Sequence, residues 1–333
     1  MTTTPTSSPA PLPQATPLAP ALVTLPPNNF DFLRFLLAVM VILSHSCVLI
    51  DGFDRGYARE PLHQFTLGQT SFGDVAVNGF FAISGFLILH SYLRSRSLLD
   101  YLKKRFLRIH PAFIVANIIC FFVVVPLVTH FPGDVYSPAN LLYTLRRGIL
   151  LRPVEFDSAF ATNPYTIPDY LDPAHRFSVI NGSMWTIPYE FRCYFILGLL
   201  GLAGLLRRQL AAILLPALYV LTFLILAGKH LTNTHILWGH WMDRIFLRAE
   251  DWPPFLTYFF AGATFYQFRH RIPISHTAAA CSTAALLVAT QIPHALVLLM
   301  PILGVYLLFY LAFCPLPLQR FAKYGDFSTG IYH

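Results

Sequence analysis

An apolar stretch of membrane-spanning length, residues 30–50, constrains this chain most, because beyond Asp31 at its start it carries the ionisable side chains of Arg34 and His45. Their separation of eleven residues returns them to within about 20° of the same face of an α-helix, about 16 Å apart along its axis. An ionisable pair inside a membrane span is costly and normally faces the protein interior. The stretch therefore predicts a transmembrane helix that carries a functional site.

The composition also indicates a membrane protein. Of 333 residues, 55% are hydrophobic and 12% are charged, and the mean hydropathy is +0.56, whereas a soluble domain carries about 25% charged residues. The net charge of +7 comes from Lys and Arg residues that gather between apolar runs, where they mark cytoplasmic loops rather than a nucleic-acid surface. The cysteines form no CxxC pair and no Cys/His cluster, so neither a disulfide framework nor a metal site is predicted.

Eight apolar runs predict an all-α, polytopic transmembrane helix bundle, with the start of a ninth span at residue 326. The predicted spans are residues 30–50, 74–93, 111–130, 184–206, 210–227, 253–268, 275–292 and 295–313. Small residues in the second span, within GFFAISGFLIL (79–89), permit close helix approach. Residues 1–27, rich in Pro, Thr and Ser, are predicted to be a disordered tail before a membrane domain at 28–333.

Basic residues predict the orientation of the bundle. Six Lys and Arg residues lie within positions 94–108, and such a density places a loop in the cytoplasm. The N-terminus is then cytoplasmic as well, and every predicted cytoplasmic loop carries at least two basic residues. We therefore expect a multi-pass protein of the cell (inner) membrane, with Arg34 in the inner half of the bilayer and His45 in the outer half.

His45 is a candidate general base. Burial disfavours the charged imidazole, so His45 is expected to be neutral, which is the state that a general base needs. The alternative is that His45 hydrogen-bonds a neighbouring helix while Arg34 extends to the cytoplasmic interface.

Two further groups of residues are candidates for binding. Arg105 and Arg108 would share a helix face at the cytoplasmic side, where paired guanidinium groups suit phosphates; alternatively, they set orientation and contact anionic lipid. Glu190, between Trp185 and Tyr194, is placed to position an acceptor hydroxyl or to orient a histidine. It would equally fit an ion pair with a neighbouring arginine, within an interfacial aromatic belt.

Four motifs in this order resemble the acyltransferase 3 family of integral membrane proteins. They are the Arg34/His45 pair, FFAISGFLI at 80–88, RFLRIHPAF at 105–113 and SMWTIPYEFRCYF at 183–195. The resemblance extends over residues 28–333. It implies a bundle of about ten transmembrane helices that moves an acyl group, commonly acetyl, from cytoplasmic acyl-CoA to a carbohydrate hydroxyl across the membrane.

The resemblance also implies roles for individual residues. His45 matches the catalytic histidine and Arg34 its partner, whereas Arg105 and Arg108 match the arginine pair that is linked to the CoA donor. Glu190 and Trp185 match a frequent Glu and Trp of the later motif. From these matches we expect Glu190 to take part in catalysis. The residues expected to contact substrate are Trp185, Asn78 and Tyr194.

The chain departs from the family pattern at two places. Asn78 occupies a position at which members often have an Asp, so another carboxylate, Asp74 or Glu190, would have to orient His45. The family also continues beyond the GD-S-GIY segment that ends this chain at residues 325–333. We therefore expect the chain to be a fragment, truncated at its C-terminus.

The resulting hypothesis is a membrane O-acyltransferase, an enzyme that transfers groups other than aminoacyl groups and holds no tightly bound cofactor. Acyl-CoA is the expected donor and a carbohydrate or cell-surface glycan the expected acceptor. His45 would deprotonate the acceptor hydroxyl or form an acyl-histidine intermediate, and Arg34 would stabilise the developing oxyanion. The alternatives are a transporter or flippase, in which Arg34 and His45 form a substrate or proton site, and an inactive membrane scaffold.

Overall fold

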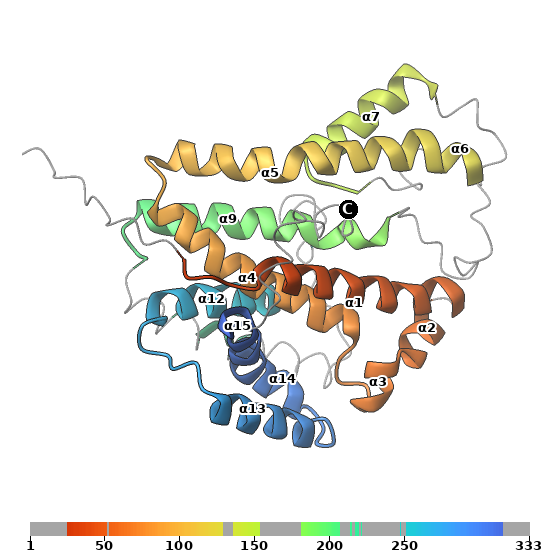
Figure 1. Cartoon of the computed structure of the whole chain (residues 1–333). Coiled ribbons are helices and arrows are strands. Elements are labelled where there is room, and N and C mark those ends of the chain that lie inside the picture. The colour runs from red at the N-terminus through yellow and green to blue at the C-terminus, as the bar shows by residue number, and fades with distance from the viewer. Residues whose placement is uncertain are drawn as a thin grey trace, which may run out of the picture.

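The computed structural model describes residues 25–51, 53–128, 136–153, 181–206 and 251–315, together with positions 214, 217–219, 221 and 247. Within these residues every regular element is a helix (Figure 1), which confirms the all-α prediction. Three predicted features lie mostly or wholly outside the described residues: the N-terminal tail, the fifth span at 210–227 and the segment at 325–333.

Four helical segments are long and apolar enough to cross a membrane: Phe30–Asp51, Phe72–Leu93, Leu98–Val124 and Ala295–Phe313. They support a membrane protein, while the full count of eight spans stays a prediction. The elements in chain order are α1 (Phe30–Asp51), α2 (Phe53–Arg59), α3 (Pro61–Phe65), α4 (Phe72–Leu93), α5 (Leu98–Ile119), η1 (Cys120–Val124), α6 (Val125–Val128), α7 (Pro138–Ile149), η3 (Gly182–Thr186), α9 (Ile187–Leu202), α12 (Trp252–Phe268), α13 (His276–Ala289), α14 (Ala295–Leu299), η5 (Met300–Gly304) and α15 (Val305–Phe313).

The start of α5 corrects the sequence prediction. The helix begins at Leu98 rather than at residue 111, so Lys103, Lys104, Arg105 and Arg108 are helical and do not form a loop, while Arg94 and Arg96 lie at the connection between α4 and α5. Ser97 caps the helix, accepting a hydrogen bond from the Asp100 backbone N at 3.1 Å, and Lys, Arg and Leu are good helix formers. Arg105 and Arg108 therefore lie on a helix of the bundle.

Helices α1 and α4 pack antiparallel. The rings of Phe30 and Phe86 lie 5.4 Å apart, and a methyl group at Gly79 would lie 2.9 Å from Leu37 Cδ2. Rising residue numbers on α1 thus pair with falling numbers on α4. This register later fixes the level of Arg34 in the bundle.

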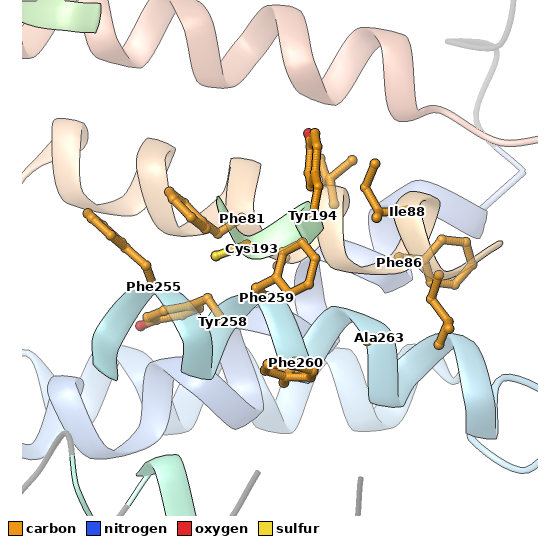
Figure 2. Packing of buried hydrophobic residues seen from close by; sticks show 14 of the residues in the cluster. Phe81, Phe86, Ile88, Cys193, Tyr194, Phe255, Tyr258, Phe259, Phe260 and Ala263 are labelled. Carbon is orange, nitrogen blue, oxygen red and sulfur yellow. The ribbon is translucent and has the colours of Figure 1, made fainter. Parts of the chain in front are cut away.

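Helices α4 and α12 make the closest contact in the described bundle. Methyl groups at Gly85 and Gly262 would overlap with the backbone carbonyl groups of Phe259 and Ala82, respectively, so the two helices touch backbone to backbone. Phe81 and Phe255 stack beside this crossing at 4.4 Å, within the apolar core that Figure 2 shows. The small residues expected to permit close approach do so against α12.

Helix α9 lies along both α4 and α5 (Figure 1). The Tyr101 hydroxyl on α5 donates to the Tyr194 carbonyl oxygen on α9 at 2.8 Å, and Gly201 of α9 faces the ring of Tyr92 on α4. Helices α4, α9 and α12 run in the same direction, and α1 and α5 run opposite to them. We call the end at which α1 begins and α4, α9 and α12 finish the Arg34 end, and the opposite end the His45 end.

Candidate active site

Arg34 and His45 lie on one continuous helix, α1, and both are partly buried. They occupy the same flank of the helix as Ala38, which is 1% exposed. Because Phe30 meets Phe86 and Leu37 meets Gly79, Arg34 lies at the level of residue 82 of α4, near the middle of that helix. His45 lies about 16 Å further along the α1 axis, toward the opposite end of the bundle.

His45 is next to the start of the segment that carries Trp185. A methyl group at Gly182 would lie 4.0 Å from His45 Cε1. Gly182 opens the short helix η3, which Asn181 caps by accepting hydrogen bonds from the backbone N of Ser183 at 3.2 Å and from its hydroxyl at 2.6 Å. This cap brings the later motif against α1, so the structure places two sequence-predicted elements of the site side by side.

Trp185 is 40% exposed and belongs to an aromatic group. Its ring lies 5.6 Å from that of Phe255 on α12 and 6.0 Å from that of Tyr189 on α9. The Tyr189 hydroxyl in turn donates to Asp251 Oδ2 at 3.0 Å. The N-termini of α9 and α12 are thereby joined at the His45 end, with the Trp185 ring left accessible on one side.

Glu190 is held by two hydroxyl groups from different helices. The hydroxyls of Ser84 on α4 and Tyr194 on α9 both donate to Glu190 Oε1. Ser84 is 2% exposed and Tyr194 is 3% exposed. Both donors are therefore inside the protein, and the carboxylate links the second span to the later motif. Sequence reasoning missed Ser84, although a serine inside an apolar span is itself a signal of a buried hydrogen bond.

Arg105 approaches the same carboxylate from α5, and Arg108 lies near Arg105 and Tyr194. Arg105 lies within electrostatic range of Glu190, Tyr194 and Arg108, and its Nη2 donates to the Ser91 hydroxyl on α4 at 3.1 Å. Its Nε atom is buried and has no partner within the part of the chain that the structure describes. Arg105, Arg108 and Glu190, which were not grouped together in the sequence analysis, thus form one polar centre.

The structure does not support either proposed orienting group for His45. The Asp74 carboxylate caps α4, accepting from the Ser71 backbone N at 2.9 Å and from the Tyr57 hydroxyl at 2.6 Å. Glu190 is bound to Ser84 and Tyr194. Among the described residues, no hydrogen bond reaches the His45 side chain.

The environment of Tyr57 shows that the Asp74 cap is a structural device. Burial and the neighbouring Asp74 carboxylate raise the pKa of Tyr57, so its hydroxyl stays protonated and continues to donate. Asn78, one turn beyond Asp74 on α4, is partly buried. By helical spacing it shares the face of Phe81 and Gly85, which packs on α12, whereas α1 packs at Gly79.

Comparisons with known proteins bear on this arrangement. The chain is 33% identical over 171 residues to the O-acetyl transferase of Shigella phage Sf6, an alignment that covers 51% of this chain and 45% of that protein. It is 31% identical over 175 residues to nodulation protein 10 of Rhizobium leguminosarum bv. viciae, covering 52% of this chain and 44% of that protein. The chain thus matches just under half the length of each of these relatives. No solved structure gave a significant match.

A family profile described as an acyltransferase domain matches residues 28–333. This match extends over nearly the whole chain and confirms the resemblance that the four sequence motifs indicated. The chain therefore belongs to the Acyl_transf_3 family of acyltransferase domains.

Proposed function

We propose that this protein is a membrane O-acyltransferase that moves an acyl group, with acetyl as the expected one, from acyl-CoA to a hydroxyl of a carbohydrate or cell-surface glycan. Membership of an acyltransferase family supports the reaction class. The observation that carries the proposal further is the polar centre of Arg105, Arg108 and Glu190 in the same bundle as His45. A donor site and an acceptor site at different depths are what transfer across a membrane requires.

The donor is proposed to enter at the Arg34 end, which the basic residues at 94–108 assign to the cytoplasm. Arg105 and Arg108 would bind the pyrophosphate of CoA, because guanidinium groups match phosphate oxygens in geometry and charge. Glu190 would act as a positioning residue for this pair, since its carboxylate is fixed by Ser84 and Tyr194 and lies within range of the Arg105 charge.

The thioester would then extend along the bundle toward His45. Neutral His45 takes the proton of the acceptor hydroxyl as that oxygen attacks the thioester carbonyl. The ester C–O bond forms, the C–S bond breaks, and the proton passes from His45 to the CoA thiolate. An acyl-histidine intermediate is the alternative route. In either route, Trp185 would contact the acceptor; its exposed ring, on the segment that begins beside His45, supports this role.

The position of Arg34 along α1 argues for a role other than stabilising the oxyanion, which was the role expected from the sequence. About 16 Å along the α1 axis separates it from His45, which is too far for direct stabilisation of an oxyanion beside the imidazole. Arg34 instead lies near the level of Ser84, so its charge would act on the donor, in concert with Arg105 and Arg108. With the Arg34 end in the cytoplasm, the N-terminus would also be cytoplasmic, and the protein would reside in the inner membrane.

The test is transfer of radiolabelled acetyl groups from acetyl-CoA to surface glycans in isolated membranes. We expect His45→Ala to lower turnover by about 10²- to 10⁴-fold, the usual contribution of a general base. His276→Ala, which alters an exposed histidine on α13, is the matched control and should keep normal turnover. Normal turnover by a well-expressed His45→Ala protein would overturn the mechanism.

A further inference from the structure

A second basic cluster lies at the Arg34 end, between the C-termini of α4 and α12. Arg94 caps α4, and its Nη1 lies 3.4 Å from His90 Nε2. His90 Nδ1 lies 3.0 Å from the hydroxyl of Tyr266 on α12. Arg269 caps the same helix, and its guanidinium lies 4.2 Å from the centre of the Tyr266 ring. A chain of contacts thus joins the two arginines.

The hydrogen bonds in this cluster leave donors available. A guanidinium can only donate, so the contact with Arg94 requires Nε2 of His90 to be an acceptor and assigns the proton to Nδ1. His90 then donates to the Tyr266 oxygen, and the Tyr266 hydroxyl hydrogen is left for another acceptor. Arg269 uses Nη1 to donate to the Tyr266 carbonyl at 2.7 Å, which leaves its remaining N–H groups available.

No acidic side chain neutralises the cluster within the described ranges, in which the ion pairs join Arg59 to Asp51 and Lys104 to Asp100. Arg94 and Arg269 both gain from the partial negative charge at a helix C-terminus. That effect accounts for each arginine by itself, but it does not account for their convergence on His90 and Tyr266. Two guanidinium groups and a hydroxyl that converge without a carboxylate form a suitable site for a phosphate monoester.

The cluster borders the polar centre described above. Arg105 donates to Ser91, the residue directly after His90 on α4. Arg105 Nε is buried, whereas Arg94 is exposed at the end of its helix, so Arg94 lies nearer the mouth. In CoA, the pyrophosphate separates the thioester arm from the ribose 3′-phosphate. A donor that inserts its thioester first would therefore place the 3′-phosphate at the mouth.

We propose that Arg94 and Arg269, with the Tyr266 hydroxyl, bind the ribose 3′-phosphate of the CoA donor. This inference rests on the proposed function and extends its donor site to the ends of α4 and α12. The same phosphate chemistry occurs in anionic lipid headgroups, so the experiment has to separate the two sources.

The experiment measures binding of CoA and of 3′-dephospho-CoA to the purified protein in phosphatidylcholine nanodiscs by isothermal titration calorimetry. The wild type should bind CoA more tightly than dephospho-CoA. The R94Q/R269Q variant should bind CoA about 10- to 100-fold more weakly, as expected for lost hydrogen bonds to a charged group, and should bind dephospho-CoA with wild-type affinity. Tyr266→Phe, a milder change, should show a smaller loss confined to CoA.

The matched control is R96Q/R271Q, which removes two nearby exposed arginines and should leave CoA affinity unchanged. Equal weakening of both ligands, or no weakening, by R94Q/R269Q would overturn the inference. Retained CoA affinity together with lost phosphatidylglycerol retention, measured by native mass spectrometry in mixed-lipid nanodiscs, would assign the cluster to lipid and also overturn it. If the folded wild type bound neither ligand, the proposed function itself would fail.

Discussion

Among single residues, Ser84 has the most specific structural role, because its hydroxyl is one of two donors to Glu190. We predict that Ser84→Ala lowers the free energy of unfolding by about 1–3 kcal/mol, the usual cost of leaving a buried acceptor underbonded. Equilibrium unfolding in detergent micelles measures this change. Acyl transfer should fall as well, because Glu190 would no longer be fixed relative to Arg105.

Ser46→Ala is the matched control for this prediction. The Ser46 hydroxyl lies on α1 and donates to the Ile42 carbonyl of its own helix at 2.7 Å, so its removal should change stability by less than about 0.5 kcal/mol. Equal losses of stability in the two variants would show that Ser84 has no special role in holding Glu190.

Tyr57 provides a prediction of pH dependence. Burial and the Asp74 carboxylate raise its pKa in the folded protein, whereas the unfolded chain has an ordinary value near 10. The stabilising contribution is therefore complete below pH of about 10 and is lost as the pH rises above that value. We expect Tyr57→Phe to be about 1 kcal/mol less stable than the wild type at pH 7, with the difference narrowing above pH of about 10. A constant difference across this range would contradict the assignment.

At the scale of helices, the crossing of α4 and α12 is the contact least able to adjust. An added methyl group at Gly85 or Gly262 meets a backbone carbonyl of the other helix, and backbone cannot move aside as a side chain can. We predict that Gly85→Ala destabilises the protein by about 1–3 kcal/mol or more, as measured by thermal unfolding in detergent.

Gly79→Ala is the control within the same helix. Its methyl group would meet the end of the Leu37 side chain, which can change rotamer, so its cost should be clearly smaller. If Gly79→Ala proved as damaging as Gly85→Ala, the loss would reflect α4 itself and not its contact with α12.

The bounds of the helices show which parts of the fold could be predicted from the sequence. The apolar runs predicted α1, α4 and α12 to within about two residues at each end, because hydrophobic length is a local property. The start of α5 was predicted wrongly, since positive charge was taken to mark a loop when Lys and Arg also favour helix. The sequence indicated that small residues in α4 would allow close approach, but the choice of α12 as partner depends on tertiary packing and is not encoded locally.

For the molecule as a whole, the sequence predicted most members of the polar centre but not their grouping. Arg105 was expected to bind the donor at the cytoplasmic side and Glu190 to position the acceptor or a histidine, yet antiparallel packing of α5 on α9 brings the two side chains into electrostatic range. Asn78 led to an expectation that the structure does not support. Its departure from the family pattern suggested that Asp74 or Glu190 orients His45, but in the structure both carboxylates accept hydrogen bonds from other groups. Helix register, which no single motif contains, decides both outcomes.

The orientation of the bundle decides whether the donor reaches the Arg34 end from the cytoplasm, and it can be measured directly. Gln64 on α3 and Arg96 after α4 are both exposed and lie at opposite ends of the bundle. With the five native cysteines replaced by alanine, a cysteine at position 64 should react with a membrane-impermeant maleimide in intact spheroplasts. A cysteine at position 96 should react only after permeabilisation, because positively charged segments remain in the cytoplasm. The reverse pattern would place Arg94, Arg105 and Arg269 on the outer side, where cytoplasmic acyl-CoA cannot reach them.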